Sequence, residues 1–251
     1  KKFNADEQRQ IDIIRQEVYE KDRLTELEYA KNEGIEQGIK QKVESIGIPL
    51  KDWDIEIYRG VLTGYNDAFI ISSEKREEIL DNCRSQDERQ RTEEIIRPIL
   101  RGRDIRRYSY QWANLWLINT HNGIKGELDR VHIEDYPAIR QHIEQYWDRV
   151  EKRADQGDTP YNLRNCAYLD LLSQPKIVWG EISDKSKFCL DTLGEFTPEA
   201  TTFMLSGDNL FYLLAFLNCS ISEYLFSTIG TTTGFGTEKR NYPDSVFFRD
   251  K

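Results

Sequence analysis

The chain has 251 residues and a formal net charge of -9, and 38% of its residues are hydrophobic and 12% aromatic. This composition excludes a disordered chain, and the length provides a buried core for one large domain or two smaller ones. No apolar run approaches the roughly 20 residues that cross a bilayer, so the protein is expected to be soluble. The acidic balance argues against general binding of polyanions but allows a local basic cleft.

The cysteines and histidines predict neither a disulfide framework nor a zinc site. The four cysteines are widely spaced without a CxxC pair, and three histidines are too few to complete a zinc set. We expect the thiols to stay reduced in a cytosol.

The first part of the chain predicts two helices. Residues 5–20 and 25–46 carry apolar side chains at helical spacing, each behind a capping signal, and Gly47 and Pro49 end the second helix. Apolar stripes with charged flanks usually pack against another surface. We expect these two to contact the rest of this chain or a neighbouring domain.

From residue 53 onward strands and helices alternate. The elements expected up to residue 157 are strands at 55–57 and 68–71, helices at 74–83 and 88–97, a strand at 114–119 and a long helix from Asp135 to Gly157. Asp87 is expected to cap the helix 88–97, and His142 to lie on the exposed flank of the long helix.

The last part predicts more strands and two helices. Segments 176–182 and 187–191 form an expected hairpin, and 201–205 a third strand. Asp208 and Ser220 are expected to cap a leucine-rich helix and a shorter one, before a run dense in glycine and threonine. Interspersed strands and helices predict an α+β or mixed α/β fold.

The segment from Arg97 to Tyr108, RPILRGRDIRRY, carries five arginines and one acid, Asp104. Arginine presents a planar charged fork that suits phosphate oxygens and guanine edges, and Gly102 lets another surface approach closely. The alternative interpretation is a solvated helix end and edge strand with arginines paired to nearby glutamates. Since Arg106 and Arg107 are adjacent, a strand would point them to opposite faces.

Tests for catalytic motifs fail. No lysine has an acid two residues before it, as a PD-(D/E)xK nuclease requires, and the histidines form no HNH-like or HExxH pattern. A DNA amino-methyltransferase needs a D/N-P-P-Y loop to hold a flipped base, and Asp158 to Tyr161 (DTPY) lacks the first proline. The Gly-Phe-Gly at 234–236 follows no strand and is a poor methyl-donor loop.

Four polar, glycine-containing loops favour a nucleic-acid surface: TGYN at 63–66, RGRDIRR at 101–107, ISDKSK at 182–187 and GTTTGFGTEKR at 230–240. Threonine hydroxyls and exposed backbone N–H groups contact phosphates, while arginine, lysine and asparagine read base edges. The candidate DNA-binding residues are Thr63, Asn66, Arg101, Gly102, Arg103, Arg106, Arg107, Lys185, Thr231, Thr232, Thr233, Lys239 and Arg240.

At these loops the sequence resembles a known family. GVLTGYNDAFII, IRPILRGRDIRRY, NLWLINTHNG, TPYNLRNCAY, PKIVWGEIS, LFYLLAFLNCSISEYLF and IGTTTGFG occur in this order over about residues 48–242. This ordered set resembles the TaqI-like target-recognition domain of type IIG restriction–modification enzymes and related adenine-specific DNA methyltransferases.

The resemblance implies that the chain is part of a longer bacterial, cytoplasmic polypeptide. In that family a nuclease and an N6-adenine methyltransferase precede the recognition domain, which would explain the missing D/N-P-P-Y loop. Residues 1–47 are then a helical linker, and 48–251 a target-recognition domain whose C-terminal end is cut short. Double-stranded DNA and the upstream methyltransferase are the implied partners. No cofactor is expected here, and S-adenosylmethionine and Mg²⁺ are expected for the parent enzyme.

Two alternatives from other classes remain open on the residues alone. One is a small enzyme that binds a methyl donor or nucleotide through the Gly/Thr loop 230–237. The other is a protein-interaction module whose aromatic side chains and N-terminal helices bind a partner.

Overall fold

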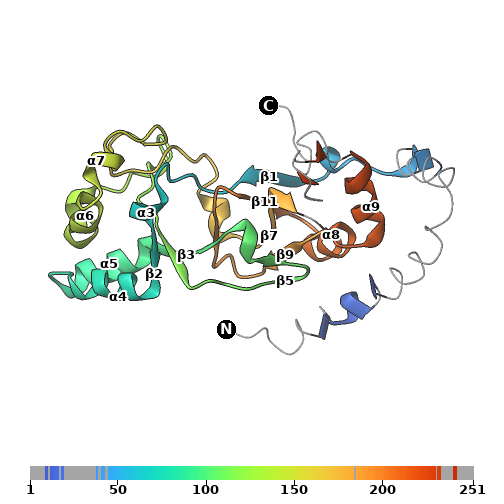
Figure 1. Cartoon of the computed structure of the whole chain (residues 1–251), viewed down its shortest axis with the longest axis horizontal. Helices are drawn as coiled ribbons and strands as arrows, with labels where there is room; N and C mark the ends of the chain where they lie inside the picture. The colour runs from blue at the N-terminus through green and yellow to red at the C-terminus, as the bar shows by residue number, and fades with distance from the viewer. Residues whose placement is uncertain are drawn as a thin grey trace.

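The computed structural model describes residues 45–183 and 185–229, together with the short pieces 9–10, 12–16, 18–19, 38, 41–42, 231–232 and 240–241. These residues form two lobes along the long axis of the molecule (Figure 1), each built on a four-stranded sheet. The described pieces between residues 9 and 46 are helical, in agreement with that part of the two N-terminal predictions. The α+β prediction is confirmed.

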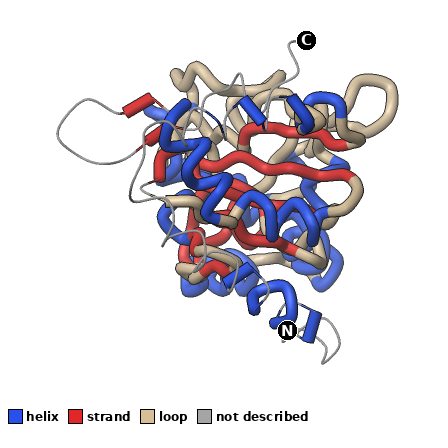
Figure 2. Tube along the Cα trace, turned by 90° about the vertical axis from the view of Figure 1, so that its right-hand side faces the viewer, coloured by secondary structure: helices blue, strands red, loops and turns tan. Residues whose placement is uncertain are grey.

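The sheet of the C-terminal lobe is antiparallel, with strand order β1-β11-β7-β9. Its strands are β1 (Ile55–Arg59), β11 (Thr202–Gly207), β7 (Lys176–Gly180) and β9 (Phe188–Asp191). Helices α8 (Leu210–Leu217) and α9 (Ser220–Ile229) lie across one face of it (Figure 2). Leucines of α8 pack there against the buried rings of Trp179 and Phe188, which lie opposite each other on β7 and β9.

The sheet of the other lobe has the order β10-β3-β6-β2 and mixed direction. Its strands are β10 (Thr197–Pro198), β3 (Ile96–Leu100), β6 (Leu115–Ile118) and β2 (Ile70–Ser72). The helices of this lobe are α3 (Asn66–Phe69), α4 (Ser73–Asp81), α5 (Gln86–Ile95), α6 (Pro137–Glu144) and α7 (Trp147–Val150). A second apolar core around Phe69, Leu117 and Ile139 joins sheet and helices.

The remaining elements are short. They are the hairpin β4 (Ile105–Arg106) and β5 (Ser109–Tyr110), the small sheet of β12 (Thr231–Thr232), β13 (Arg240–Asn241) and β8 (Ile182–Ser183), and the 3₁₀ turns η1 (Leu50–Asp52), η2 (Gly102–Asp104), η3 (Ile133–Asp135) and η4 (Asp170–Ser173). A third apolar cluster, including Leu100, Ile105, Val178 and Phe196, lies where the lobes meet. Strand β10 pairs with β3 in one sheet, and the chain then continues directly into β11 of the other sheet. This short segment links the two sheets.

Several sequence predictions of local structure were wrong. The segment 68–71 begins as helix α3 and becomes strand only at Ile70. The helix expected to reach residue 97 ends at Ile95, because Pro98 disfavours a helical conformation at Arg97. The long helix from residue 135 to 157 divides into α6 and α7 around Gln145 and Tyr146.

Two caps and one histidine also differ from expectation. Ser85, not Asp87, caps α5 by accepting from the Glu88 N–H at 3.1 Å. Asn209, with a left-handed backbone that asparagine tolerates, occupies the cap position of α8 in place of Asp208. His142 is buried, because α6 packs against both α3 and α4, and its Nε2 lies 3.1 Å from the Ala68 carbonyl oxygen.

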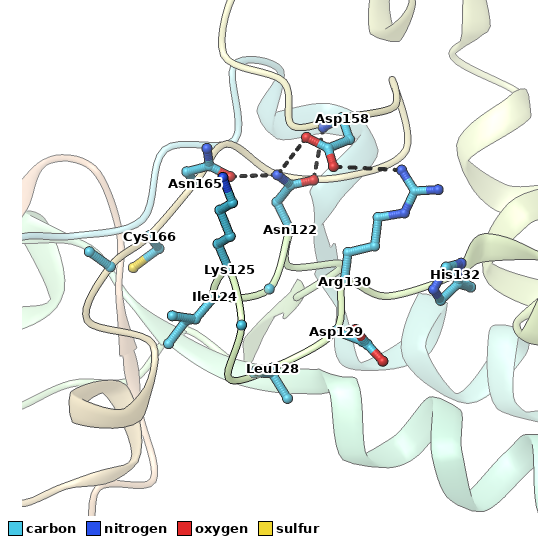
Figure 3. A pocket seen from close by; sticks show the side chains of 13 residues that line it. Asn122, Ile124, Lys125, Leu128, Asp129, Arg130, His132, Asp158, Asn165 and Cys166 are labelled. Atoms are coloured by element: carbon cyan, nitrogen blue, oxygen red, sulfur yellow. Dashed lines mark hydrogen bonds and ion pairs between the residues drawn. The ribbon is translucent and has the colours of Figure 1, made fainter.

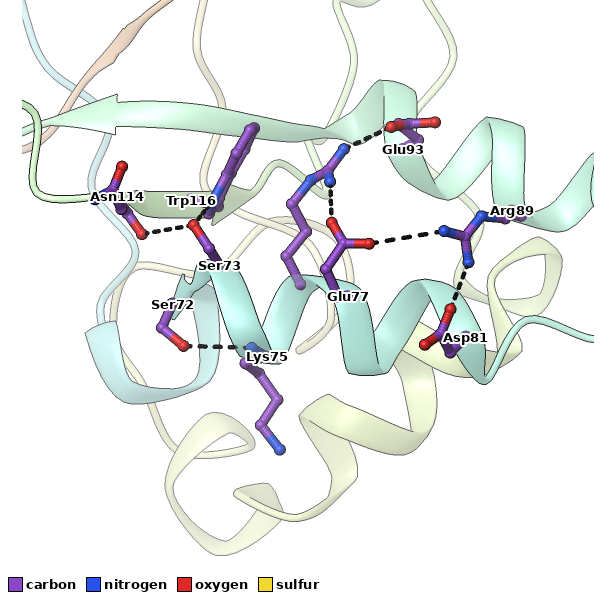
Figure 4. Close-up of polar contacts among 10 residues, drawn as sticks. Ser72, Ser73, Lys75, Glu77, Asp81, Arg89, Glu93, Asn114 and Trp116 are labelled. Atoms are coloured by element: carbon purple, nitrogen blue, oxygen red, sulfur yellow. Dashed lines mark hydrogen bonds and ion pairs between the residues drawn. The ribbon is translucent and has the colours of Figure 1, made fainter.

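The helical hairpin α4–α5 is held by an ion-pair network (Figure 4). Arg76 pairs with Glu77 at 2.6 Å and Glu93 at 2.7 Å, while its guanidinium lies 4.4 Å from the ring centroid of Trp116. Arg89 pairs with Asp81 at 2.9 Å. Arg76 and Arg89 are thus matched by acids, so this network is a structural support and not a basic patch.

Candidate nucleic-acid interface

A hollow of about 500 Å³ lies where the two lobes meet. Its walls come from the N-terminus of α3, from the arginine segment, from the end of β7 with β8, and from the turn before β11. The lining residues used below are Asn66, Arg101, Gly102, Arg103, Arg106, Gly180, Glu181, Ser183, Lys187, Glu199 and Thr201. Five of the thirteen candidates predicted from sequence therefore lie together: Asn66, Arg101, Gly102, Arg103 and Arg106.

The arginine segment enters the hollow as a closed turn. Asp104, 4% exposed, accepts bonds from Arg101 Nε at 3.0 Å and Arg101 Nη2 at 2.8 Å, and from the Arg101 backbone N–H at 3.0 Å. The hydrogen bonds to this carboxylate raise the pKa of Arg101 above its ordinary value. Arg101 is thus a structural residue of the turn, since its charge is already compensated.

Two glycines allow this turn to lie on the sheet. A Cβ built on Gly180 would lie 3.2 Å from the Cα of Gly102, closer than side chains normally pack. The Gly102 N–H donates to Thr201 Oγ1 at 3.2 Å, and the Thr201 hydroxyl in turn donates to the Glu199 carboxylate at 2.5 Å. The backbone N–H of Gly102 is therefore used inside the protein.

Arg103 and Arg106 carry the exposed positive charge of the hollow. Among the described residues Arg106 donates to neutral groups only: the Arg103 carbonyl at 2.6 Å, the Ile105 carbonyl at 2.9 Å and the Gln111 amide oxygen at 3.2 Å. Arg103 forms no side-chain hydrogen bond or ion pair with the described part of the chain. Neither charge is compensated by a described carboxylate, so both are available to an anion.

Arg107 and Arg97 lie outside the hollow. Arg107 donates to the Asn218 carbonyl at the C-terminus of α8, at 2.6 Å, and lies over the ring of Tyr108. Arg97, on β3, donates to the Gly194 carbonyl at 3.2 Å. Arg106 therefore lines the hollow, whereas the adjacent Arg107 contacts the end of α8. The acid Asp104 pairs with Arg101 and with neither of these two arginines.

Asn66 and Thr63 have different positions. Asn66 is exposed at the start of α3 and lines the hollow, whereas Thr63 is 2% exposed. The Thr63 hydroxyl donates to Asn66 Oδ1 at 2.5 Å. In this arrangement Thr63 orients Asn66, and its own side chain faces the interior.

The two remaining loops meet beside the hollow. Strand β13 pairs with β8, placing Arg240 opposite Ser183, and β12 places Thr232 opposite Arg240. Lys185 is exposed next to β8. Thr233 and Lys239 lie outside the described residues. Through these described residues the ends of the loop 230–240 adjoin the loop 182–187, which lines the hollow together with the loops 63–66 and 101–107.

Some lining residues were missed by sequence reasoning. Lys187 belongs to the predicted loop 182–187 but was not singled out, and Glu181, Glu199 and Thr201 gave no signal. Glu181 pairs with Arg59 at 2.8 Å, and Glu199 accepts the N–H and hydroxyl of Thr201. Glu181 is therefore paired with a cation, whereas Glu199 keeps its charge because Thr201 is neutral. The lining keeps a positive balance, since its three arginines and Lys187 outnumber these two acids.

A second hollow, of about 640 Å³, lies in the other lobe beside the loop 122–130 (Figure 3). Asn122, Asp158 and Asn165 point toward one another there: the Asn122 Nδ2 donates to Asp158 at 3.1 Å and to Asn165 at 2.5 Å. Sequence reasoning did not single out this hollow; the loop beside it contains two glycines, Gly123 and Gly126, both with positive φ.

No candidate metal centre is found among the described residues. They contain no group of three His, Cys, Asp or Glu side chains able to hold a metal, and the four cysteines are free. Tyr161 of the DTPY segment donates to Glu144 at 2.9 Å and packs against Trp147. None of the helices described has the length and apolarity needed to cross a membrane.

Comparison with known proteins identifies the family. The model of the TaqI-like C-terminal specificity domain matches residues 97–242, from the arginine segment to just after β13. The chain belongs to this family, as the resemblance in the sequence indicated. No curated protein matches it.

Two solved structures share the fold. One is the type IIL restriction–modification enzyme MmeI in complex with DNA, with a TM-score of 0.52 and 13% identity over 80% of this chain. The other is the type IIG restriction endonuclease BpuSI, with a TM-score of 0.50 and 13% identity over 84% of this chain. The present chain spans 25% of the length of each.

Proposed function

We propose that this chain is a DNA target-recognition domain of a restriction–modification enzyme and that the hollow between the lobes is its DNA-binding surface. The observation that carries the proposal is that three of the polar loops line one hollow, with Asn66, Arg103 and Ser183 among the lining residues, while β13 at the end of the fourth loop pairs with β8. The likeness to MmeI, whose structure is a DNA complex, supports it at the level of fold.

The electrostatics of the hollow favour a polyanion despite the net charge of -9. Acids at its edge are paired with Arg59 or bonded to Thr201, whereas Arg103 and Arg106 have no described carboxylate partner. Phosphates bound here would neutralise charges that the folded chain leaves uncompensated, and counterion release would add to the affinity.

The proposal extends to the parent protein. An N6-adenine methyltransferase located upstream would carry out the chemistry, using S-adenosylmethionine, and the recognition domain would position the target adenine in it. Endonuclease activity, with Mg²⁺, would belong to the same polypeptide, in a bacterial cytoplasm. Residues 1–47 would form the helical linker to that methyltransferase.

The test is selection of duplexes with a randomised central segment by the purified chain at low salt, followed by titration of the enriched duplex and a scrambled one. We expect a single enriched motif and tighter binding of the enriched duplex. Calorimetry with S-adenosylmethionine serves as the control for the enzyme alternative and should give no heat of binding. Equal affinity for both duplexes, or no binding of either, would refute the proposal.

A further inference from the structure

The geometry around Asn66 points to a specific role: we propose that Asn66 reads the major-groove edge of one adenine and that buried Thr63 and Arg153 fix its orientation. This inference rests on the proposed function and deepens it. It names the base that Asn66 contacts and the two residues that position Asn66, whereas the proposed function rests on the charge of the surface.

Asn66 presents a pre-oriented amide. Its side chain is exposed in the hollow, next to Arg103 and Arg106 in the lining. The Thr63 hydroxyl donates to Oδ1 at 2.5 Å, and this bond holds the amide group in one orientation. Nδ2 donates to no described residue, and Oδ1 retains a second lone pair. One donor and one acceptor therefore remain available, side by side.

Arg153 holds the loop from beneath. It is 5% exposed, and its guanidinium donates to the carbonyl of Thr63 at 2.5 Å. It also donates to the carbonyls of Asp155, Asn162 and, at 3.1 Å, Pro160. Burial lowers the pKa of Arg153 to about 10, so the side chain stays charged at neutral pH.

The surroundings of Arg153 make this contact rigid. The guanidinium also lies 4.5 Å from the ring centroid of Phe69, the last residue of α3. The buried guanidinium of Arg153 thus contacts both Thr63, which bonds to Asn66, and Phe69, the last residue of α3. Movement of Asn66 relative to the hollow would require breaking these contacts, because an unpaired buried charge is costly.

An asparagine amide with both atoms available matches adenine. The N7 acceptor and the N6 amino donor of adenine face the major groove in the same spacing, and asparagine pairs with both. A phosphate would use only the amide nitrogen and would not require Oδ1 to be oriented. The ordering by Thr63 and Arg153 therefore favours a base edge over a phosphate as the ligand of Asn66.

The experiment uses the duplex motif enriched by the wild-type chain and single-base variants of it. Asn66→Ala, Thr63→Val and Thr63→Ser are compared with the wild type, and Asn82→Ala, an exposed asparagine after α4, is the matched control. Asn66→Ala should relax the preference at one adenine position by about 5- to 150-fold and leave the other positions unchanged. Asn82→Ala should change nothing.

The Thr63 pair tests the relay. Thr63→Val removes the hydroxyl without changing the shape and should relax the preference at the same adenine, whereas Thr63→Ser should restore it. A merely structural role of Thr63 would weaken binding to all duplexes alike. Thermal melting of each variant shows whether it is folded, and exposed Asn66→Ala carries the test if Thr63→Val does not fold.

The inference is overturned if Asn66→Ala weakens all duplexes equally, as a phosphate contact would, or if the relaxed position is not adenine. It is also overturned if the preference of Asn66→Ala equals that of the wild type. In these three cases the chain still selects a motif, and the proposed function stands. If the wild-type chain selects no duplex, both the proposed function and this inference fail.

Discussion

Arg101 and Asp104 form a two-bond ion pair that closes the turn between β3 and β4, with the carboxylate 4% exposed. This pair divides the arginine segment by role. Arg101 is compensated inside the protein, whereas Arg103 and Arg106 extend from the same turn without an acidic partner in the described structure. The pair therefore shapes the surface that its neighbours offer to DNA.

Removing the carboxylate should open this turn. Asp104→Ala leaves the Arg101 guanidinium and backbone N–H without their acceptor, and we expect a loss of about 1–3 kcal/mol in the free energy of unfolding. Urea denaturation measures it. Arg103→Ala is the control, because its side chain is exposed and should change stability by less than about 0.5 kcal/mol. Equal stability of the two variants would show that the ion pair does not hold the turn.

The contact between Gly102 and Gly180 predicts a steric effect. Gly180→Val would place methyl groups against the turn, which must then move away from β7, at a cost of about 1–3 kcal/mol. Weaker DNA binding should accompany the lower melting temperature, since the turn carries Arg103 and Arg106. Gly38→Val is the control, because nothing lies within 4 Å of a Cβ built there. Wild-type stability of Gly180→Val would contradict the close approach.

The buried pair of Lys176 and Asp191 predicts a large stability effect. The two side chains are 0% and 4% exposed and lie opposite each other on β7 and β9, 2.9 Å apart. Lys176→Met leaves a buried carboxylate without its cation, and we expect a loss of about 3–5 kcal/mol. The surface pair of Arg59 and Glu181 provides the comparison: Arg59→Met should cost less than about 1 kcal/mol. Similar losses in both variants would count against the role of burial.

His142 predicts a dependence of stability on pH. Burial lowers the pKa of its imidazole, and Nδ1 is buried without a hydrogen-bond partner in the described part of the chain. The unfolded chain therefore takes up a proton more readily than the folded one, and stability present above the unfolded pKa, about 6.5, is lost as the pH falls through and below it.

His142→Gln tests this dependence by denaturation at several pH values between about 7.5 and 5.5. The variant keeps a donor for the Ala68 carbonyl but does not titrate, so its stability should fall less than that of the wild type over this interval. The pKa of His121 is also lowered by burial and gives both proteins a common background. Parallel pH profiles would mean that His142 does not contribute.

Much of the fold followed from local patterns. The β7–β9 hairpin, strand β6 and helix α8 coincide with short apolar runs in the sequence, and the structure has them where expected. The wrong predictions have different physical causes: Pro98 ends α5 through a local effect, whereas tertiary contacts decide the burial of His142. His142 is buried because α6 packs against both α3 and α4. The helical spacing of apolar residues indicated one buried face of α6 and gave no sign of the second contact.

The candidate site could be predicted only in outline. Glycine-containing polar loops indicated the surface, but the division of roles within it depends on pairing across the fold. Arg101 bonds to an acid three residues away and Arg107 to a carbonyl 111 residues away, and both looked alike in sequence. The site role of each candidate residue stays a prediction until DNA binding is measured.

The most direct test of the proposed DNA surface is the salt dependence of binding by Arg103→Ala and Arg106→Ala, with Arg84→Ala, an exposed arginine between α4 and α5, as the control. Each phosphate contact contributes about 0.9 to the slope of log K against log salt. We predict that each hollow variant binds the enriched and scrambled duplexes more weakly and lowers the slope by roughly 1, while Arg84→Ala keeps the wild-type slope. Wild-type affinity and slope in both hollow variants would contradict the account.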